Sequence, residues 1–468
     1  MLYNKISLFL CVVKSLCGTA QAVKPVRLCR LFISCGACGQ AADMSGDVVM
    51  LEAEFVARVE EYGGNAFVVG GWVRDFLRGE QPEDKDYVVT GLEVSRFRRI
   101  FPEGILIGRS FPVFLLPIDA ADGRGSRQCE VAMARRESKS GSGYRGFSAE
   151  AGRFITIEED LYRRDLTVNS IAMDLHSGRI VDLYGGRADI EAGVLRPVSE
   201  RFGEDPVRAL RAARFAAKLG YRPAPELVSA MGKCRRELAE EPGERILGEL
   251  KKALATDRPS LFFRLLHSAG LLEDTFPEIH ALIGKTQPEA YHPEGDAFEH
   301  VMLIVDEVAG RTKNITARFA ALCHDLGKGA TPEEMLPHHY GHEVKGLEVL
   351  AGWNRRVTLP SVWLKAARFI ISQHMRAPRL ARPPKICELL LMMKAVEAEL
   401  PVSDTKIIIG ADNRGLPPYL EHAEEIIAAM GGISGSSAPS GLTGRKIGDW
   451  IKRQQLEVCR KMLENIMP

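Results

Sequence analysis

Short apolar runs of the length of buried strands lie in the first part of the chain. Residues 66–69 and 87–89 flank a predicted helix over residues 72–77. Together with further strand-like runs they predict a small mixed β-sheet. These further runs are residues 104–107, 113–116 and 130–134.

Polar stretches follow these runs, and the spacing of apolar residues then changes. Residues 119–127 are polar and rich in glycine, which predicts a hairpin excursion, and residues 139–144 predict a mobile loop. From about residue 158 the spacing of apolar positions becomes helical and stays so. Residues 285–296 carry several prolines and glycines, which predicts a linker.

This order of elements predicts an α+β fold, in which a domain with a small mixed sheet precedes two all-α domains. At 468 residues the chain is too long for a single hydrophobic core. A Gly/Ser-rich stretch at residues 431–444 interrupts the last helical block. The predicted divisions are a non-domain extension at 1–47, a sheet domain at 48–186, a helical domain at 187–284, and a second helical domain with a tail at 285–468.

The composition is that of an ordinary globular protein, with 46% apolar and 26% charged residues. The formal net charge is only +1, so any nucleic-acid binding must come from local basic surfaces. No apolar run reaches the ~20 residues of a membrane span.

The first 45 residues differ from the rest, because they hold five of the ten cysteines and no acidic residue before Asp43. We interpret them as an artificial extension ahead of a working start at Met44 or Met50, with a targeting peptide as the alternative. The other five cysteines are scattered without metal or disulfide spacing, which favours a reducing cytoplasm.

A glycine pair marks the first candidate site. Gly70 and Gly71 end a predicted strand and open a helix that carries Arg74 and Asp75 in its first turns. Glycine lets backbone N–H groups approach a triphosphate, and a helix N-terminus favours anions. Gly71 and Arg74 are therefore candidates for nucleotide binding, although a strand-Gly-Gly-helix turn is also common packing.

Two carboxylates follow in the segment Asp84-Lys-Asp86, which leads into a predicted strand. Side chains two apart on a strand point the same way, ~6.6 Å apart, so Asp84 and Asp86 could hold two Mg²⁺ ions against a phosphate. Glu130, on a neighbouring predicted strand, is a possible third carboxylate. The plain alternative is a solvated turn.

A third segment supplies fixed cations and polar groups for a nucleotide. It runs from Arg163 to Asn169, and its candidates for nucleotide binding are Arg164, Asp165 and Asn169. An exposed basic helix face is the alternative interpretation.

Five motifs, in this order, resemble those of class II tRNA nucleotidyltransferases. They cover roughly residues 62–250 and are Gly70-Gly-Trp-Val-Arg-Asp75, Asp84-Lys-Asp86, Arg163-Arg-Asp-Leu-Thr-Val-Asn-Ser-Ile-Ala172, Asp182-Leu-Tyr-Gly-Gly186 and Glu204-Asp-Pro-Val-Arg208. The resemblance implies a nucleotidyltransferase head with a five-stranded sheet, then a helical neck and body for nucleotide and tRNA recognition. It implies template-independent addition and repair of the 3′-terminal CCA of tRNA, with CTP, ATP and Mg²⁺.

The last of these motifs offers a way to choose bases. Asp205 followed by Pro206 predicts a helix start, and Asp205 and Arg208 then lie on one face. A carboxylate beside a guanidinium complements the amine and acceptor that cytosine and adenine share, and rejects uracil and guanine. The resemblance assigns base selection to Glu204, Asp205 and Arg208, and the switch from C to A to the loop at 139–147. Arg211 is expected to bind nucleotide nearby, and Arg208 and Arg211 to lie off the apolar face of the helix.

A histidine cluster marks a second candidate site. Cys323-His-Asp-Leu-Gly-Lys328 follows an apolar helix, and histidine and aspartate together suit Ni²⁺ or another divalent transition metal. The cluster resembles the HD phosphohydrolase superfamily, which implies Lys328 near phosphate and His339, His342 and His374 as second-rank ligands. The ligands that the resemblance implies are His300, His324, Asp325 and Asp412.

For bacterial nucleotidyltransferases with such a domain, the resemblance implies 2′,3′-cyclic phosphodiesterase, 2′-nucleotidase and phosphatase activities. Expected partners are tRNA, bound through its acceptor and T arms, and CTP and ATP, in a cytoplasmic monomer or homodimer without a membrane. The alternatives are a poly(A) polymerase, an enzyme that adds only CC or only A, and a phosphohydrolase with an RNA-binding module.

Overall fold

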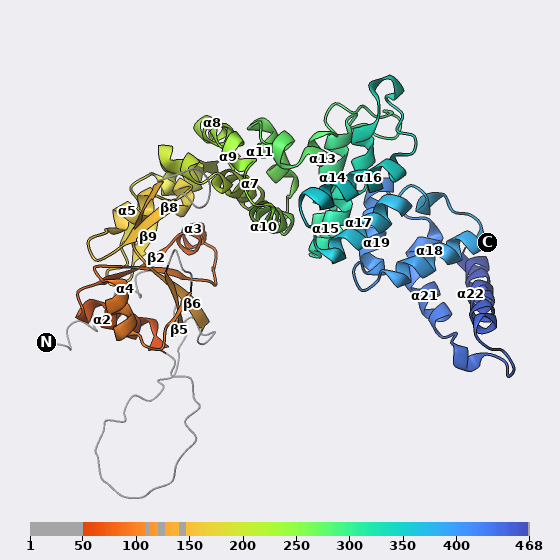
Figure 1. Ribbon diagram of the computed structural model, residues 1–468, viewed down its shortest axis with the longest axis horizontal. Helices are drawn as coiled ribbons and strands as arrows, with labels where there is room; N and C mark the ends of the chain where they lie inside the picture. Colours follow the sequence, from red (N-terminus) through yellow and green to blue (C-terminus); the bar gives the residue numbers. More distant parts are fainter. Residues whose placement is uncertain (1–49, 108–111, 120–126, 140–146, 467–468) are drawn as a thin grey trace, which may run out of the picture. The chain divides into compact units, whose positions relative to one another are not determined.

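The structure is a computed structural model that describes residues 50–107, 112–119, 127–139 and 147–466 (Figure 1). The expected N-terminal extension at 1–47 lies outside the described residues. So do the centre of the expected hairpin excursion and most of the expected mobile loop.

Eight strands form one mixed sheet in the order β1-β5-β6-β3-β2-β9-β10, with β4 paired to β5. The pairs β1–β5 and β3–β6 are parallel and the others antiparallel. All the predicted strands are present, but the sheet exceeds the five strands that the family resemblance implied. The strands are β1 (Met50–Leu51), β2 (Asn65–Val69), β3 (Asp86–Thr90), β4 (Ile105–Ile107), β5 (Val113–Asp119), β6 (Arg127–Met133), β9 (Ala172–Asp174) and β10 (Ile180–Val181).

The middle residues of the two central strands, β2 and β3, are apolar because both faces of the sheet are covered. Val68 and Val89 belong to the core that also contains Phe55 of α2 and Phe97 of α4. The alternate residues, such as Val69, pack in a separate cluster with residues of α5. Side chains two apart share a face, so the strands read as continuous apolar runs.

The expectation of uninterrupted helix after residue 158 is wrong. β9 pairs with β2 and β10 with β9, which extends the sheet. A separate hairpin joins β7 (Arg135–Lys139) to β8 (Phe147–Ala151), and β11 (Val194–Leu195) pairs with β12 (Arg222–Pro223). Strands of two or three residues are too short to show a period of two in the sequence.

Helices make up most of the remaining chain up to residue 280 (Figure 1). They are α2 (Glu52–Glu61), α3 (Gly71–Leu77), α4 (Val94–Ile100), α5 (Ile157–Tyr162), α6 (Gly186–Ala192), α7 (Val207–Leu219), α8 (Pro225–Lys233), α9 (Arg235–Leu238), α10 (Gly243–Leu254), α11 (Ser260–Ser268), α12 (Leu272–Thr275) and α13 (Pro277–His280). Short 3₁₀ turns include η2 (Thr167–Asn169) and η3 (Glu200–Glu204).

Helix α7 differs from its prediction in two ways. It begins at Val207, and the Asp205 carboxylate accepts a hydrogen bond from the Val207 N–H at 3.1 Å. Arg208, expected off the apolar face, is only 7% exposed. Its guanidinium donates to the Arg201 carbonyl at 3.0 Å, which gives the buried charge a polar partner.

The C-terminal part is helical, and the predicted interruption before its last helix is confirmed. Asp296 caps α14 by accepting hydrogen bonds from the N–H groups of Phe298 and Glu299. The helices are α14 (Ala297–Arg311), α15 (Ile315–Cys323), α16 (His342–Arg356), α17 (Ser361–Gln373), α18 (Pro383–Ala395), α19 (Val402–Asn413), α20 (Pro418–Glu421), α21 (Ala423–Gly431) and α22 (Arg445–Ile466). The 3₁₀ turns η4 (Leu326–Ala330), η5 (Glu333–Met335), η6 (Ala377–Arg379) and η7 (Gly435–Ser437) lie between them. Among the described helices, none has both the length and the apolar character needed to cross a membrane.

Gly327 fixes a close approach between η4 and α16. A Cβ placed there would lie 1.8 Å from the His342 carbonyl oxygen and 2.5 Å from the Gly346 nitrogen. Backbone atoms cannot rotate away as a side chain can, so Gly327→Ala should lower the free energy of unfolding by about 3 kcal/mol. Urea unfolding followed by circular dichroism measures this.

The matched control is Gly310→Ala on α14, where no atom lies within 4 Å of the added Cβ. This change should raise the free energy of unfolding by up to about 1 kcal/mol, since alanine favours helix. Wild-type stability in Gly327→Ala would show that η4 and α16 are not in close contact.

Candidate active sites

A cavity of about 930 Å³ lies between the sheet and the helices that follow it. Ten basic and five acidic side chains line it, in a chain whose net charge is only +1. The lining comes from strands β2, β3, β5, β6 and β7, from helices α3, α7 and α10, and from the turns after α5 that include η2. The cavity therefore provides a local basic surface of the kind that an anionic substrate needs.

Two of the predicted carboxylates lie side by side on the cavity wall. Asp86 and Glu130 are direct partners in the parallel pair β3–β6. Desolvation raises the pKa of Asp86, and the negative charge of Glu130 raises it further. Adjacent carboxylate oxygens are donors that Mg²⁺ accepts, and one bound cation would relieve their repulsion.

The expected placing of Asp84 on the same strand as Asp86 is wrong. β3 begins at Asp86, and Asp84 lies in the irregular segment before it. Asp84 is not among the residues that line the cavity, but its charge contributes to raising the pKa of Asp86. The strand period therefore does not fix the relation between the two carboxylates.

The glycine pair opens helix α3 at the edge of this cavity. Gly70 has φ +69°, a left-handed conformation that glycine adopts without penalty, and a Cβ there would lie 3.2 Å from Arg164 Nη1. Arg74 is only 1% exposed, and its guanidinium donates to both oxygens of Asp75 at 2.7 Å and to Asn169 Oδ1 at 2.6 Å. Arg74 is thus rigidly held beside the open backbone of Gly71.

Asp165 connects the segment after α5 to helix α7. Its Oδ1 accepts from the Leu166 N–H at 2.9 Å and from Asn169 Nδ2 at 3.4 Å. Its Oδ2 accepts from Arg211 Nε at 2.7 Å. Burial alone would raise the pKa of Asp165, but the Arg211 guanidinium lowers it to about 2. Asp165 is therefore ionised at neutral pH, and Arg211 is held at the cavity.

Sequence reasoning missed the residue that orders the two arginines of this segment. Asp160 is fully buried, and its Oδ1 pairs with Arg163 at 2.6 Å and its Oδ2 with Arg164 at 3.0 Å. Despite desolvation, the two guanidinium groups lower the pKa of Asp160. The spacing of three and four residues was the available signal, because such residues share a helix face.

Asp205 and Arg208 both line the cavity, but Glu204 does not. Both Asp205 oxygens lie 3.1 Å from Arg245 Nη2, and Arg245 also pairs with Glu241 at 2.6 Å. The role of Arg245 was not predicted from the sequence. No local pattern relates Asp205 to a residue 40 positions later.

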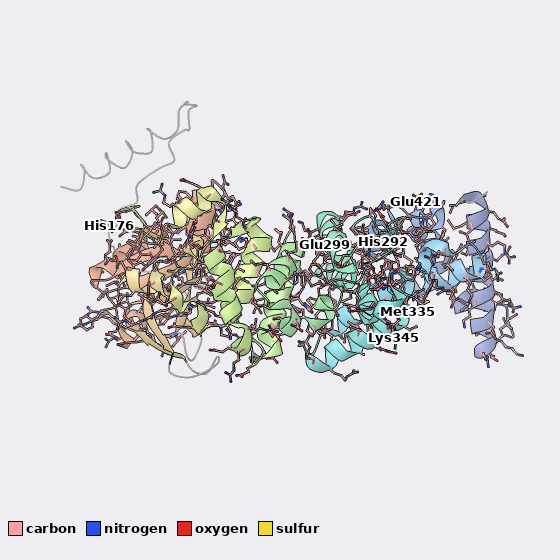
Figure 2. The ribbon with its side chains drawn as sticks, turned by 90° about the horizontal axis from the view of Figure 1, so that it is seen from above. His176, His292, Glu299, Met335, Lys345 and Glu421 are labelled. Atoms are coloured by element: carbon pink, nitrogen blue, oxygen red, sulfur yellow. The ribbon has the colours of Figure 1, made fainter. Side chains whose placement is uncertain are left out.

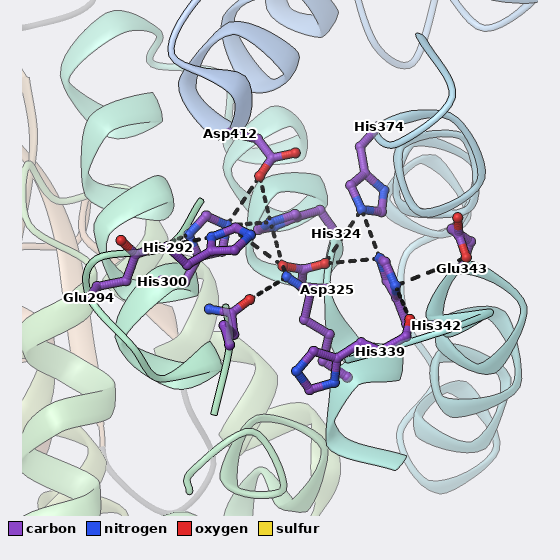
Figure 3. Close-up of polar contacts among 12 residues, drawn as sticks. His292, Glu294, His300, His324, Asp325, His339, His342, Glu343, His374 and Asp412 are labelled. Carbon is purple, nitrogen blue, oxygen red and sulfur yellow. Dashed lines mark hydrogen bonds and ion pairs between the residues drawn. The ribbon is translucent and has the colours of Figure 1, made fainter. Parts of the chain in front are cut away.

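The second site is a group of histidines around one buried carboxylate (Figure 3). Asp325 Oδ2 lies 3.2 Å from His324 Nε2 and 3.6 Å from His300 Nε2. Asp325 Oδ1 lies 3.3 Å from His342 Nε2 and 3.4 Å from His374 Nε2. The two oxygens thus face two separate imidazole pairs.

Asp412 completes the first of these two clusters. Its Oδ1 lies 3.1 Å from His300 Nε2 and 3.6 Å from His324 Nε2. The ligand atoms of His300, His324 and Asp412 lie within 4.8 Å of one another, and so do those of Asp325, His342 and His374. The four expected ligands are therefore brought together, and His342 and His374 join them. His339 does not, since it bonds Thr331 and Thr286.

The donor set around Asp325 fits divalent transition-metal ions. Asp325 is fully buried, and neither oxygen makes a hydrogen bond of normal geometry, although nitrogen atoms surround both. Burial works to raise the pKa of Asp325, but Lys328 and His324 hold it well below its usual range. An ionised carboxylate among imidazoles is the donor chemistry that Ni²⁺, Mn²⁺ or Fe²⁺ accepts.

Residues 285–296, expected to be a linker, fold against this site. Gln287 is buried and accepts a hydrogen bond from Lys328 Nζ. Glu294 Oε1 contacts His300 Nδ1 at 2.6 Å and His292 Nδ1 at 3.1 Å (Figure 2 marks His292). A carboxylate on the far nitrogen of a histidine orients its ring, so Glu294 positions His300. No periodic pattern in these residues indicates the contact between Glu294 and His300.

Three protein families match consecutive parts of the chain. A family described as "Poly A polymerase head domain" matches residues 66–196, and one described as "Probable RNA and SrmB- binding site of polymerase A" matches residues 220–283. A third, "HD domain", matches residues 297–406.

Two curated relatives are matched over nearly their whole length. The "Multifunctional CCA protein" of Pseudomonas paraeruginosa is 38% identical over 415 residues, 85% of this chain and 98% of that protein. The protein of the same name from Nitrosococcus oceani is 36% identical over 84% of this chain and 98% of its own. Among solved structures, the Bacillus stearothermophilus CCA-adding enzyme in complex with CTP has TM-score 0.58 and 24% identity, over 88% of this chain and 91% of its own. That likeness shows the fold.

The Asp165–Arg211 pair gives a prediction for pH dependence. A folded-state pKa near 2, below the usual 3.8, means that ionised Asp165 stabilises the fold fully above about pH 4 and loses that effect as pH falls through 2. Asp165→Asn should lower the free energy of unfolding by about 2 kcal/mol at pH 6 and by about 1 kcal/mol at pH 3. Urea unfolding of the wild type and of Asp165→Asn at both pH values measures this difference in the free energy of unfolding. A difference that is as large at pH 3 as at pH 6 would contradict the pairing of Asp165 with Arg211.

Proposed function

This chain belongs to the family of the multifunctional CCA proteins, and we propose that it adds and repairs the 3′-terminal CCA of tRNA with CTP and ATP. The observation that carries this proposal is the 36–38% identity with such proteins over 98% of their length. The chain is a tRNA nucleotidyltransferase with an HD phosphohydrolase domain. The location that we propose for the protein is the cytoplasm, because tRNA and nucleoside triphosphates are found there.

In the nucleotidyl-transfer site, we assign the metal-holding role to Asp84 and Asp86, with Glu130, the direct neighbour of Asp86 in the sheet, as a third carboxylate. When bound there, Mg²⁺ supplies activation of the 3′-hydroxyl and charge neutralisation at the pyrophosphate. The N-terminus of α3 at Gly71 offers backbone N–H groups to the triphosphate. Arg164, held by Asp160, supplies a fixed cation on the same cavity wall.

Arg74, Asn169, Asp165 and Arg211 form one connected set of hydrogen bonds behind these groups. We assign them to nucleotide binding, with Arg74 and Asp165 mainly orienting their partners. Ordering the cations beforehand reduces the reorganisation that the substrate must cause.

We assign base selection to Asp205 and Arg208, the charged residues of the family motif that line the cavity, whereas Glu204 does not line it. Asp205 can accept from the amine of cytosine or adenine, and Arg208 can donate to the adjacent ring acceptor. Arg245 would fix the Asp205 carboxylate in one orientation through its contacts to both oxygens. The acceptor and T arms of tRNA are the proposed docking elements, for a monomer or a homodimer.

The products of nucleotide addition test the proposed CCA addition. A tRNA transcript that ends before its CCA should gain two residues with CTP alone and a third when ATP is added, and then stop. A sequencing gel resolves these products. A long ladder with ATP alone would instead make the chain a poly(A) polymerase, and a stop after CC would make it a partial enzyme.

Variants separate chemistry from folding in this assay. Asp86→Asn and Glu130→Gln keep the size of each side chain but remove a charge, so addition should fall by at least about a hundredfold. The control Glu191→Gln removes one charge from the exposed side of α6 and should add CCA at the wild-type rate. Wild-type addition by Asp86→Asn would remove Asp86 from the catalytic set.

For the HD site we propose hydrolysis of 2′,3′-cyclic phosphodiesters, 2′-nucleotides and phosphate monoesters. His300, His324, Asp325 and Asp412 would hold one metal ion, and Asp325, His342 and His374 fit a second. Ni²⁺ or another divalent transition metal there supplies Lewis-acid activation of the phosphate and of water. A damaged tRNA end carries phosphate where the other site needs a free hydroxyl, so the two activities would act in sequence.

A variant of the HD site tests the link between the two activities. Asp325→Asn should lose most repair of tRNA ending in a 2′,3′-cyclic phosphate, because the neutral amide binds metal weakly. The same variant should add CCA to a hydroxyl-ended transcript as the wild type does. Removing metal with a chelator, then restoring only Mg²⁺, should reproduce this pattern. Repair of the cyclic phosphate by Asp325→Asn at the wild-type rate would refute the role of the HD site.

A further inference from the structure

Arg414 has an unusual backbone conformation at the end of helix α19. Its φ is +55° and its ψ is 27°, in the left-handed region. It is the only residue other than glycine with positive φ in the described part of the chain. The Gly415 N–H donates to the Gly410 carbonyl at 3.0 Å, as in helices whose last position is glycine.

A glycine or asparagine would adopt this conformation with less strain than arginine. Strained positions of this kind gather at functional sites, where the side chain is used. A helix stop alone would be served at least as well by glycine or asparagine at residue 414, so it does not explain an arginine here. The side chain of Arg414 needs another explanation.

Arg414 lies at the rim of the histidine clusters. It follows Asp412 by two residues, and its Nη2 lies 3.9 Å from Glu294 Oε2. The other oxygen of Glu294 contacts His300 Nδ1 at 2.6 Å. The Glu294 carboxylate thus connects the Arg414 guanidinium to His300, which belongs to the metal-ligand cluster.

The charge of Arg414 is largely available to a substrate. Its side chain is 70% exposed, and the 3.9 Å pair with Glu294 is the one ion pair that it makes among the described residues. Lys328, the other cation at the clusters, is buried and already engaged by Asp325 at 2.6 Å and by Gln287. A phosphate arriving from solvent would therefore meet Arg414 before Lys328.

We propose that Arg414 is the substrate-binding residue of the HD site, and that it donates hydrogen bonds to the terminal phosphate of an RNA 3′ end. The planar guanidinium matches a phosphate or cyclic phosphodiester with two parallel N–H groups. At the left-handed turn that ends α19, the Arg414 guanidinium lies 3.9 Å from Glu294. This inference rests on the proposed hydrolytic function of the same site.

Glycine and asparagine both suit the left-handed conformation at residue 414. Replacing Arg414 by either residue therefore tests substrate binding without disturbing the end of helix α19. Arg414→Gly and Arg414→Asn remove the guanidinium but keep or relieve the left-handed turn. We expect KM for a short RNA ending in a 2′,3′-cyclic phosphate to rise about tenfold or more. The melting temperature should stay within about 2 °C of the wild type or exceed it. Arg414→Lys keeps the charge but lacks the two parallel N–H groups of the guanidinium. Its KM should therefore lie between that of the wild type and those of Arg414→Gly and Arg414→Asn.

The matched control is Arg311→Gln, at the opposite end of α14 from His300. Both arginines line one cavity of about 570 Å³, but Arg311 is paired with Glu307. Eleven residues of helix put it roughly 16 Å along the axis from His300. Its KM should equal that of the wild type. All assays use the full chain loaded with Mn²⁺ or Ni²⁺, with bound metal measured for each variant.

The outcomes distinguish this inference from the function on which it rests. A raised KM with unchanged metal content and melting temperature supports phosphate binding by Arg414. An unchanged KM in Arg414→Gly and Arg414→Asn overturns it, and so does a loss of activity that follows a lower melting temperature or lost metal. A wild-type chain that hydrolyses no phosphate ester contradicts the proposed hydrolytic function and removes the inference with it.

Discussion

Buried carboxylates are the constraint on which the nucleotidyl-transfer site depends. Ten basic side chains converge on one cavity, and without compensation they would repel one another. Asp160 holds two arginines, Asp75 holds Arg74, and Asp165 holds Arg211. Each pairing fixes a guanidinium in place and offsets its charge, so the cavity stays attractive to anions without destabilising the fold. A chain with almost no net charge can therefore present a strongly basic site.

The HD site also depends on charges that hold one another in place, but here nitrogen groups surround a carboxylate. Here one buried carboxylate, Asp325, is surrounded by imidazoles and Lys328. Neither of its oxygens makes a hydrogen bond of normal geometry, which suits metal ions as their partners. The two sites share no residue among those that we assign. One gathers cations for a triphosphate, and the other gathers donors for metal ions.

The sequence predicted most strongly what is local and periodic. The apolar runs predicted the central strands, and the motifs predicted residues that the structure brings together, with Asp86 and Asp165 at the cavity and Asp325 among the histidines. It failed where a contact joins distant segments, as between Asp205 and Arg245, or where a strand is as short as β10. Asp84 was misplaced because the strand begins two residues later than the period suggested. Such errors arise because tertiary contacts, not local pattern, decide element ends and side-chain partners.

We propose that one chain carries two sites whose reactions follow one another on the same tRNA. Each site works without the other being active in the same molecule. The most direct measurement mixes two inactive variants, Asp86→Asn and Asp325→Asn, with CTP, ATP and tRNA that ends in a cyclic phosphate after its discriminator base. Neither variant alone should complete the CCA end, but the mixture should, because released hydroxyl-ended tRNA can move between molecules. A mixture that accumulates hydroxyl-ended tRNA without extending it, or a single variant that completes the end, would contradict two independent sites.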